Sequence, residues 1–168
     1  MPEIAWGKKV SGPFKSKVIQ ISSDLGCDPS HLMSAMAFET GETFSPSIQN
    51  KVSKATGLIQ FMPKTAVGLG TTIAQLAQMS AVDQLDFVKK YLSPFKNKMG
   101  MLSDVYMTIL FPKAVGKAEA FVLFAQPSVA YAQNKGLDAN KDGQVTKGEA
   151  AVKVQAKLVK GLGASLRG

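Results

Sequence analysis

The sequence predicts a mainly α-helical protein that forms one domain over residues 1–168. Three observations indicate this class. Apolar residues recur at helical spacing in several segments, and residues typical of helix starts and ends separate these segments. No alternating apolar and polar pattern longer than a few residues competes with them. The chain has 168 residues, 45% of them hydrophobic and 19% charged, which suits one globular domain.

Five helices are expected in the first part of the chain. The first has an apolar stripe made by Phe14, Val18, Ile21 and Leu25. Asp28, as N-cap before a proline, begins the second helix, which should end near Thr40 because Gly41 follows. The other three are a short buried helix over Gly57–Gly68 and helices over Thr72–Leu76 and Ala81–Leu92.

Three more helices are expected in the second part. An apolar helix over Asp104–Phe111 should stop at Pro112, which has no backbone N–H to donate. A loop is expected over 113–126, and Pro127 should then open a helix that ends near Gly136. The last helix is expected over about 147–160.

The charge indicates a polyanionic partner. The chain has 20 Lys and Arg against 12 Asp and Glu, a formal net charge of +8. Nucleic acid, an anionic membrane face and an acidic cell-wall polymer all fit this charge. Nucleic acid is not expected, because Arg167 is the only arginine and no helix-turn-helix or zinc-finger spacing is present.

Composition also limits location and cofactors. No apolar run approaches the ~20 residues of a membrane span, and the first residues do not resemble a secretory signal. The single cysteine, Cys27, excludes an internal disulfide and a cysteine-based zinc site. A monomer without an organic cofactor is expected.

Residues 138–149 match the spacing of an EF-hand calcium loop. The expected ligands are Asp138, Asn140, Asp142, the backbone carbonyl of Gln144, and Glu149. Gly143 stands where the loop must turn sharply, and hard oxygen ligands suit calcium. A structural calcium ion that ties the last helix to the preceding one is therefore expected. The alternative is an acidic turn that binds no metal.

Glu39 is the candidate catalytic acid. It lies near the end of an apolar helix, next to Met36, Ala37 and Phe38. Apolar surroundings disfavour the carboxylate anion, so the pKa of Glu39 should rise toward neutrality. A general acid near pH 7 needs such a pKa. A glutamate near a helix end can also be an ordinary solvated charge.

Two segments carry a resemblance to a known family. They are Glu39-Thr-Gly-Glu-Thr-Phe44-Ser-Pro46 and Gly57-Leu-Ile-Gln60-Phe-Met62-Pro63-Lys-Thr65-Ala66. Together they resemble the soluble lytic transglycosylases and goose-type lysozymes, and most closely the bacteriophage lysins that carry an EF-hand-like loop. The resemblance covers about residues 28–70. Phe44 stands two residues farther from the glutamate than in the family, and Tyr131 and Asn134 are three apart where the family often has them adjacent.

The resemblance implies a lysozyme-like domain that cleaves peptidoglycan between N-acetylmuramic acid and N-acetylglucosamine. Glu39 would be the acid and base, and the 6-hydroxyl of the sugar would close a 1,6-anhydro ring. Gln60, Phe61 and Met62 would line the groove, while Tyr131, facing Glu39, and Asn134 would bind substrate. The protein would act from the host cytoplasm on the cell wall during phage lysis, or from the virion.

Three alternatives stay open. A muramidase on the same fold would hydrolyse the bond with water, with Glu42 as the nearest second carboxylate in the sequence. A non-catalytic, calcium-dependent wall-binding or virion protein could keep the fold. The C-terminal helix, with Lys153, Lys157 and Lys160 on one stripe, could dock on an anionic outer-membrane or membrane surface, which would suit a membrane-disrupting protein. A helix packed on the core, with its lysines in solvent, is the simpler interpretation.

Overall fold

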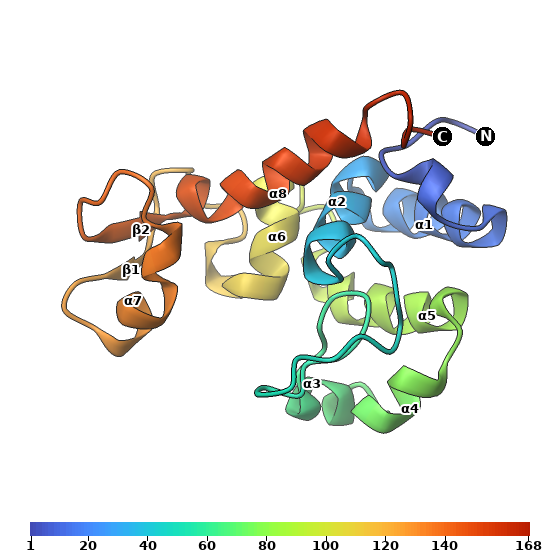
Figure 1. Ribbon diagram of the computed structural model, residues 1–168, viewed down its shortest axis with the longest axis horizontal. Coiled ribbons are helices and arrows are strands. Elements are labelled where there is room, and N and C mark those ends of the chain that lie inside the picture. Colours follow the sequence, from blue (N-terminus) through green and yellow to red (C-terminus); the bar gives the residue numbers. More distant parts are fainter.

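The computed structural model describes residues 1–168 and is mainly helical, as predicted. Eight α-helices, several 3₁₀ turns and one pair of short strands make up the fold (Figure 1). The helices are α1 (Gly12–Leu25), α2 (Pro29–Glu39), α3 (Pro63–Gly68), α4 (Ile73–Gln78), α5 (Ala81–Leu92), α6 (Leu102–Leu110), α7 (Val129–Asn134) and α8 (Lys147–Gly161). The strands are β1 (Val122–Ala125) and β2 (Gln144–Thr146). None of the helices has the length and apolar character needed to span a bilayer.

The expected helix starts are confirmed by their caps. The side chains of Asp28, Thr72 and Ser80 each accept a hydrogen bond from a backbone N–H two or three residues later. These bonds satisfy N–H groups that have no partner inside the helix. Residues at the helix starts therefore set the boundaries of α2, α4 and α5.

Two expectations are corrected. Only Pro63–Gly68 of the segment Gly57–Gly68 is helical, because Thr56 and Phe61 exchange two backbone hydrogen bonds and close a turn before α3. The expected loop 113–126 contains β1, which pairs antiparallel with β2. Strands of four and three residues are too short to show an alternating pattern, and they pair only after the chain has turned back.

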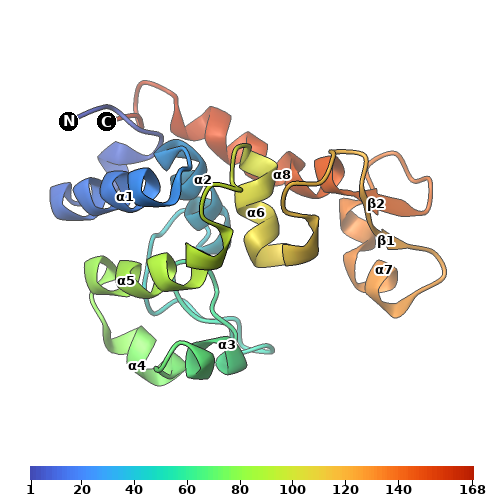
Figure 2. The ribbon, with the colours of Figure 1, turned by 180° about the vertical axis from the view of Figure 1, so that it is seen from behind.

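Helix α2 lies at the centre of the main core. Leu32, Met33, Ala35, Met36 and Ala37 are all fully buried. Helices α1, α6 and α8 contact α2, and Figure 2 shows α6 beside α8 from the opposite side. Because α2 is enclosed in this way, its last residue, Glu39, is held in a fixed position.

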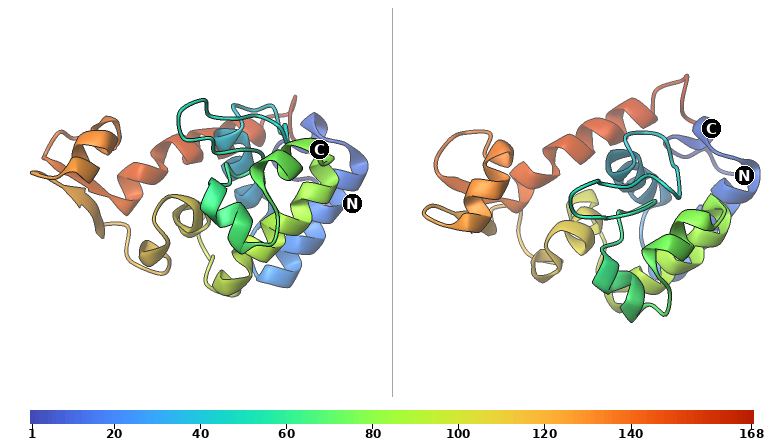
Figure 3. Two further views of the ribbon diagram at one scale, coloured as in Figure 1. Left: turned by 90° about the horizontal axis from the view of Figure 1, so that it is seen from below. Right: turned by 60° about the horizontal axis from the view of Figure 1, so that its bottom comes forward.

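A small lobe projects from this helical body. It consists of β1, α7, β2 and the connecting loops, residues 122–146, and Figure 3 shows it at one end of the molecule in both views. Val145 of β2 is fully buried in a second, smaller core with Leu123, Met107 and Val154. The apolar residues of α6 and α8 therefore join the lobe to the body.

Helix α8 runs from the small lobe to the chain ends (Figure 1). Its apolar face packs on α2 and α6, and Val154 is fully buried. At its far end the Nε1 of the buried Trp6 donates a hydrogen bond to the carbonyl of Lys157 at 3.0 Å. The apolar face of α8 is therefore used inside the protein, although Leu162 just beyond it is 43% exposed.

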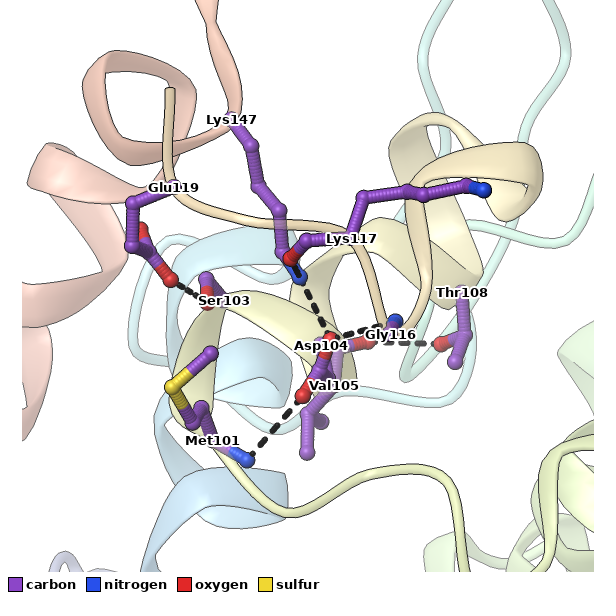
Figure 4. Close-up of polar contacts among 9 residues, drawn as sticks. All are labelled: Met101, Ser103, Asp104, Val105, Thr108, Gly116, Lys117, Glu119 and Lys147. Carbon is purple, nitrogen blue, oxygen red and sulfur yellow. Dashed lines mark hydrogen bonds and ion pairs between the residues drawn. The ribbon is translucent and has the colours of Figure 1, made fainter. Parts of the chain in front are cut away.

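A buried ion pair joins α8 to α6. The Nζ of Lys147 lies 2.5 Å from Oδ1 of Asp104, and both side chains are almost completely excluded from solvent (Figure 4). Lys147 also donates to the carbonyl of Lys117 at 2.7 Å. Asp104 accepts further bonds from the backbone N–H groups of Gly116 and Met101. Charges taken out of water are tolerated only when they are paired and hydrogen-bonded in this way.

Candidate functional site

Glu39 is the last residue of α2, and its side chain is half-buried. Burial raises the pKa of its carboxyl group from 4.5 to about 7. Glu39 takes part in none of the six ion pairs of the protein, so no cation offsets the cost of burying the anion. A carboxyl group with this pKa can give and take a proton near neutral pH.

The carboxyl group lies in a groove of about 360 Å³. One wall comes from the end of α2, a second from the loop before α3, and a third from α6. The lining residues are Phe38, Glu39, Asn50, Ala55, Gln60, Met62, Tyr106, Ile109 and Leu110. Glu39 is the only acidic residue among them, and most of the others are apolar.

Tyr106 of α6 lies in the same groove and was not among the residues predicted from the sequence. Its ring packs edge-on against Phe38, with the ring centres 5.6 Å apart. Burial and the charge of Glu39 both raise the pKa of the Tyr106 hydroxyl, so this hydroxyl stays protonated and can donate a hydrogen bond. In the sequence Tyr106 is a tyrosine within an apolar helix, and periodicity does not say which cavity it faces.

The three residues predicted from the second motif have different positions. Gln60 and Met62 line the groove with Glu39, and Met62 is 48% exposed at its rim. The side-chain amide of Gln60 donates to the carbonyls of Ile48 and Gly57, both at 3.1 Å, and so holds the loop wall. Phe61 is instead a buried core residue. It does not line the Glu39 groove but a small cavity of about 90 Å³ that shares Gln60 and Met62 with it.

Gln84 of α5 forms hydrogen bonds to the loop before α3, which makes up the second wall of the groove. Its Oε1 accepts a hydrogen bond from the N–H of Leu58 at 2.7 Å, and its Nε2 donates to the carbonyl of Pro46 at 2.9 Å. The backbone of Gly57 has φ of 85°, and a Cβ there would lie 2.3 Å from the Gln84 side chain. The glycine of the motif is thus required for packing as well as for conformation.

Tyr131 and Asn134 do not lie in the groove. Tyr131 belongs to α7 in the small lobe, where its hydroxyl donates to Oδ2 of Asp138 at 2.7 Å. The side-chain amide of Asn134 donates to the carbonyl of Ala130 within the same helix. The expectation that Tyr131 faces Glu39 is therefore corrected. The spacing of Tyr131 and Asn134 put these two residues on one face of α7, but it could not show which part of the protein α7 contacts.

Glu42 lies outside the Glu39 groove and forms ion pairs with two lysines of α8. Its carboxylate lies 2.5 Å from Nζ of Lys157 and 2.6 Å from Nζ of Lys160, both on α8. Hydrogen bonds from Lys157 and Lys160 lower the pKa of Glu42 below its ordinary value. Glu42 does not line the groove, so the groove has no second carboxylate beside Glu39.

The 138–149 loop has the internal hydrogen bonds of a tight, ordered turn. Oδ2 of Asp138 accepts from the N–H of Gly143 at 3.0 Å, and Asn140 Oδ1 accepts from the N–H of Asp142 at 2.9 Å. Asp142 Oδ1 accepts from the N–H of Gln144 at 2.9 Å. Four of the five predicted ligand residues, Asp138, Asn140, Asp142 and Gln144, therefore belong to one hydrogen-bonded turn.

The fifth, Glu149, caps the start of α8. Its Oε2 accepts from the N–H and from the hydroxyl of Thr146, both at 2.9 Å. Two carboxylate oxygens in the loop, Asp138 Oδ1 and Glu149 Oε1, are buried and have no hydrogen-bond partner. No group of three or more His, Cys, Asp and Glu side chains is gathered closely enough to hold a metal ion. The donor types are those that a hard cation takes, but the carboxylates are not gathered around a common point.

The groove therefore combines one carboxyl group that titrates near neutrality with one hydroxyl donor and apolar walls. Such a site can protonate a leaving oxygen and later accept a proton, all with the same residue. No protein-family model matches the chain, and no curated protein matches it.

Proposed function

We propose that this protein is a peptidoglycan lytic transglycosylase with a lysozyme-like fold, which cleaves the bond between N-acetylmuramic acid and N-acetylglucosamine. The observation that supports this most is Glu39 as the single carboxyl group of the groove, with a pKa of about 7. The resemblance of the segments 39–46 and 57–66 to lytic transglycosylases suggests the substrate. An excess of basic residues suits an anionic wall polymer.

In the first step the protonated Glu39 carboxyl group gives its proton to the glycosidic oxygen as the bond from this oxygen to C1 breaks. In the second step the Glu39 carboxylate takes the proton of the 6-hydroxyl, whose oxygen forms the new bond to C1. The proton count is restored and no water is consumed. Tyr106, across the groove, would donate its hydroxyl hydrogen to the sugar that reacts.

A muramidase that uses water is the second candidate. Hydrolysing glycosidases position a second carboxylate about 5–9.5 Å from the acid. Glu42, the nearest in sequence, is bound by Lys157 and Lys160 outside the groove. This arrangement favours the reaction that uses one acid.

Mass spectrometry of the fragments released from purified peptidoglycan tests the proposal. Fragments with a 1,6-anhydro end, one water lighter than the reducing form, are expected from the wild type and none from Glu39→Gln. Glu42→Gln is the matched control and should keep the activity. Reducing ends would identify a hydrolase instead. Release that survives Glu39→Gln would overturn the role of Glu39, and no release by the wild type would favour a wall-binding or virion protein.

The same proposal includes a structural calcium ion in the 138–149 loop. Asp138, Asn140, Asp142, the carbonyl of Gln144 and Glu149 would hold it. A bound calcium ion would neutralise the carboxylates of the loop. Calorimetric titration at up to millimolar calcium should show one site in the wild type and none in Asp142→Ala; no heat in the wild type would remove calcium from the proposal.

We also propose a setting. A monomer that acts on the wall from the host cytoplasm during phage lysis, or from the virion, is consistent with the family that the motifs resemble. Lysis of host cells from within, compared with lysis from outside, separates the two routes. A contribution from docking of the basic stripe of α8 on an anionic membrane is tested by Lys153→Gln, because Lys153 is exposed and free of ion pairs.

A further inference from the structure

The loop wall of the Glu39 groove, residues 46–61, contains no helix and only isolated β-bridges. It is part of the connection between α2 and α3 (Figure 1), and it lines the groove with Asn50, Ala55 and Gln60. A helix is held by a repeating series of backbone hydrogen bonds, whereas a connection of this kind depends on single bonds. The residues that make these bonds therefore decide the shape of the groove.

Internal hydrogen bonds give the loop wall its own shape. The N–H of Gly57 donates to the carbonyl of Ile48 at 2.8 Å. The side-chain amide of Gln60 donates to the carbonyls of Ile48 and Gly57, both at 3.1 Å. Because all these partners lie inside the loop wall, the bonds fix its shape but not its position relative to Glu39.

Gln84 joins the loop wall to a helix. Its Oε1 accepts from the N–H of Leu58 at 2.7 Å, and its Nε2 donates to the carbonyls of Pro46 and Leu76, both at 2.9 Å. Pro46 and Leu58 belong to the loop wall, whereas Leu76 belongs to α4. No other hydrogen bond joins residues 46–61 to a helix of the protein.

The side chain of Gln84 is fully buried, and its acceptor and both its donors are used. Leu58 and Phe61 of the loop wall are buried as well, but apolar contacts have no preferred direction, whereas hydrogen bonds require a defined distance and angle. A Cβ on Gly57 would lie 2.3 Å from Oε1 of Gln84, so the backbone lies directly against the amide. The position of the loop wall therefore depends on Gln84.

The position of the loop wall matters for Glu39, because burial is what raises the pKa of its carboxyl group. A loop wall that moved outward would admit water and let this pKa fall toward 4.5. It would also move Gln60 relative to the acid. Gln84 does not line the groove, so it can act on the groove only through the loop wall.

We propose that Gln84 is a positioning residue of the Glu39 groove, which fixes the loop wall through Pro46 and Leu58 at the place that the reaction requires. This inference rests on the proposed function, because it takes the reaction to occur between the loop wall and α6. Gln84 is not a catalytic residue, since it lies outside the groove.

Gln84→Met tests the inference, because methionine has a similar length and makes none of the three hydrogen bonds. Lys17→Met is the matched control: Lys17 joins α1 to the same helix α5 by donating to the carbonyl of Val82 at 2.9 Å. Carbon-13 NMR of labelled glutamate side chains measures the pKa of Glu39, and Glu39→Gln assigns its resonance. This pKa should fall from about 7 toward 4.5 in Gln84→Met and stay at about 7 in Lys17→Met.

Activity supplies a second readout. The alkaline limb of the pH profile of kcat/KM follows the ionisation of the catalytic acid. In Gln84→Met this limb should move to lower pH together with the pKa of Glu39, and kcat/KM at pH 7 should fall roughly 10- to 100-fold, as for a misplaced binding group. Lys17→Met should keep the wild-type profile. A loss of stability alone would lower the amount of active protein without moving the limb.

The outcomes separate the two proposals. A folded Gln84→Met that keeps both the pKa of Glu39 and the wild-type kcat/KM would overturn the inference alone. An equal fall of this pKa in Lys17→Met would also overturn it, because a general loosening of α5 would then explain the change. A wild type that releases no fragments, together with the expected fall of the pKa in Gln84→Met, would overturn the proposed function alone.

Hydrogen exchange of the wild type decides the matter if Gln84→Met does not fold. The N–H of Leu58 should exchange about as slowly as that of the buried Val88 in α5, and far more slowly than that of the exposed Lys51 in the same loop. Exchange of Leu58 as fast as that of Lys51 would overturn the inference, because the loop wall would then open independently of α5.

Discussion

Glu39→Gln is expected to stabilise the fold in alkaline solution while it removes activity. The carboxyl group has a pKa of about 7 in the folded protein and an ordinary value of 4.5. At about 1.4 kcal/mol per pKa unit, the buried anion costs the folded state about 3 kcal/mol once both folded and unfolded forms are ionised. Glutamine has the shape of the protonated carboxyl group and does not ionise, so it avoids this cost.

The sign of the effect depends on pH. Below about pH 4.5 the group is protonated in both states and the cost is absent. Between pH 4.5 and 7 the folded state holds the proton and the unfolded state releases it, so the stability of the wild type falls as the pH rises. Above pH 7 the loss is complete. The stability gained by Glu39→Gln should therefore be near zero at pH 4 and about 3 kcal/mol at pH 8.

Urea unfolding followed by circular dichroism at pH 4, 6 and 8 measures this difference. For a chain of this size the gain corresponds to a Tm higher by about 6–12 °C at pH 8. Glu42→Gln is the matched control with the opposite sign: the pKa of Glu42 is lowered by Lys157 and Lys160, so the wild-type residue stabilises the fold above pH 4.5 and that contribution is lost in acid. A Glu39→Gln variant that gains nothing at pH 8, or gains as much at pH 4, would refute the reasoning.

Three further predictions concern other parts of the protein. Lys147→Met should lower the free energy of unfolding by about 3–5 kcal/mol, because it leaves the buried Asp104 without its cation. Lys89→Met, at a half-exposed pair with Asp24, should cost less than about 1 kcal/mol, and equal losses in urea unfolding would contradict this. Tyr106→Phe should lower kcat roughly 10- to 100-fold with little change in Tm, because the edge-on ring contact is kept and only the hydroxyl donor is lost; unchanged kcat would remove Tyr106 from the site. Removal of calcium with a chelator should lower the Tm of the wild type and leave that of Asp138→Asn unchanged, because a ligand that binds only the folded state stabilises it. A wild-type Tm that does not change with the chelator would argue against a bound metal.

The helical class and most helix boundaries were predictable because they depend on neighbouring residues. Asp28 and Ser80 cap their helices through bonds to residues two or three positions away, and Pro112 ends α6 through its own ring. The raised pKa of Glu39 was also predictable, since the apolar residues just before it belong to the most buried part of α2.

The groove was predictable only in part. Gln60 and Met62 were placed in it by the motif, but Phe61 between them turned out to be a core residue. Tyr131 and Tyr106 could not be distinguished from the sequence, because both lie on short helices with apolar neighbours. Their roles depend on α7 joining the small lobe and α6 joining the groove, which are contacts between residues far apart in the chain.

Most helices, the acid at the end of α2 and the oxygen-rich loop 138–149 could be predicted from the sequence alone, because each of these depends on a few consecutive residues. Which side chains meet follows from the packing of the helices. It buried Lys147 beside Asp104, bound Glu42 to α8 and left Glu39 as the only acid in its groove. The physical reason is that burial and pairing of charges depend on packing between distant segments, which local spacing does not encode.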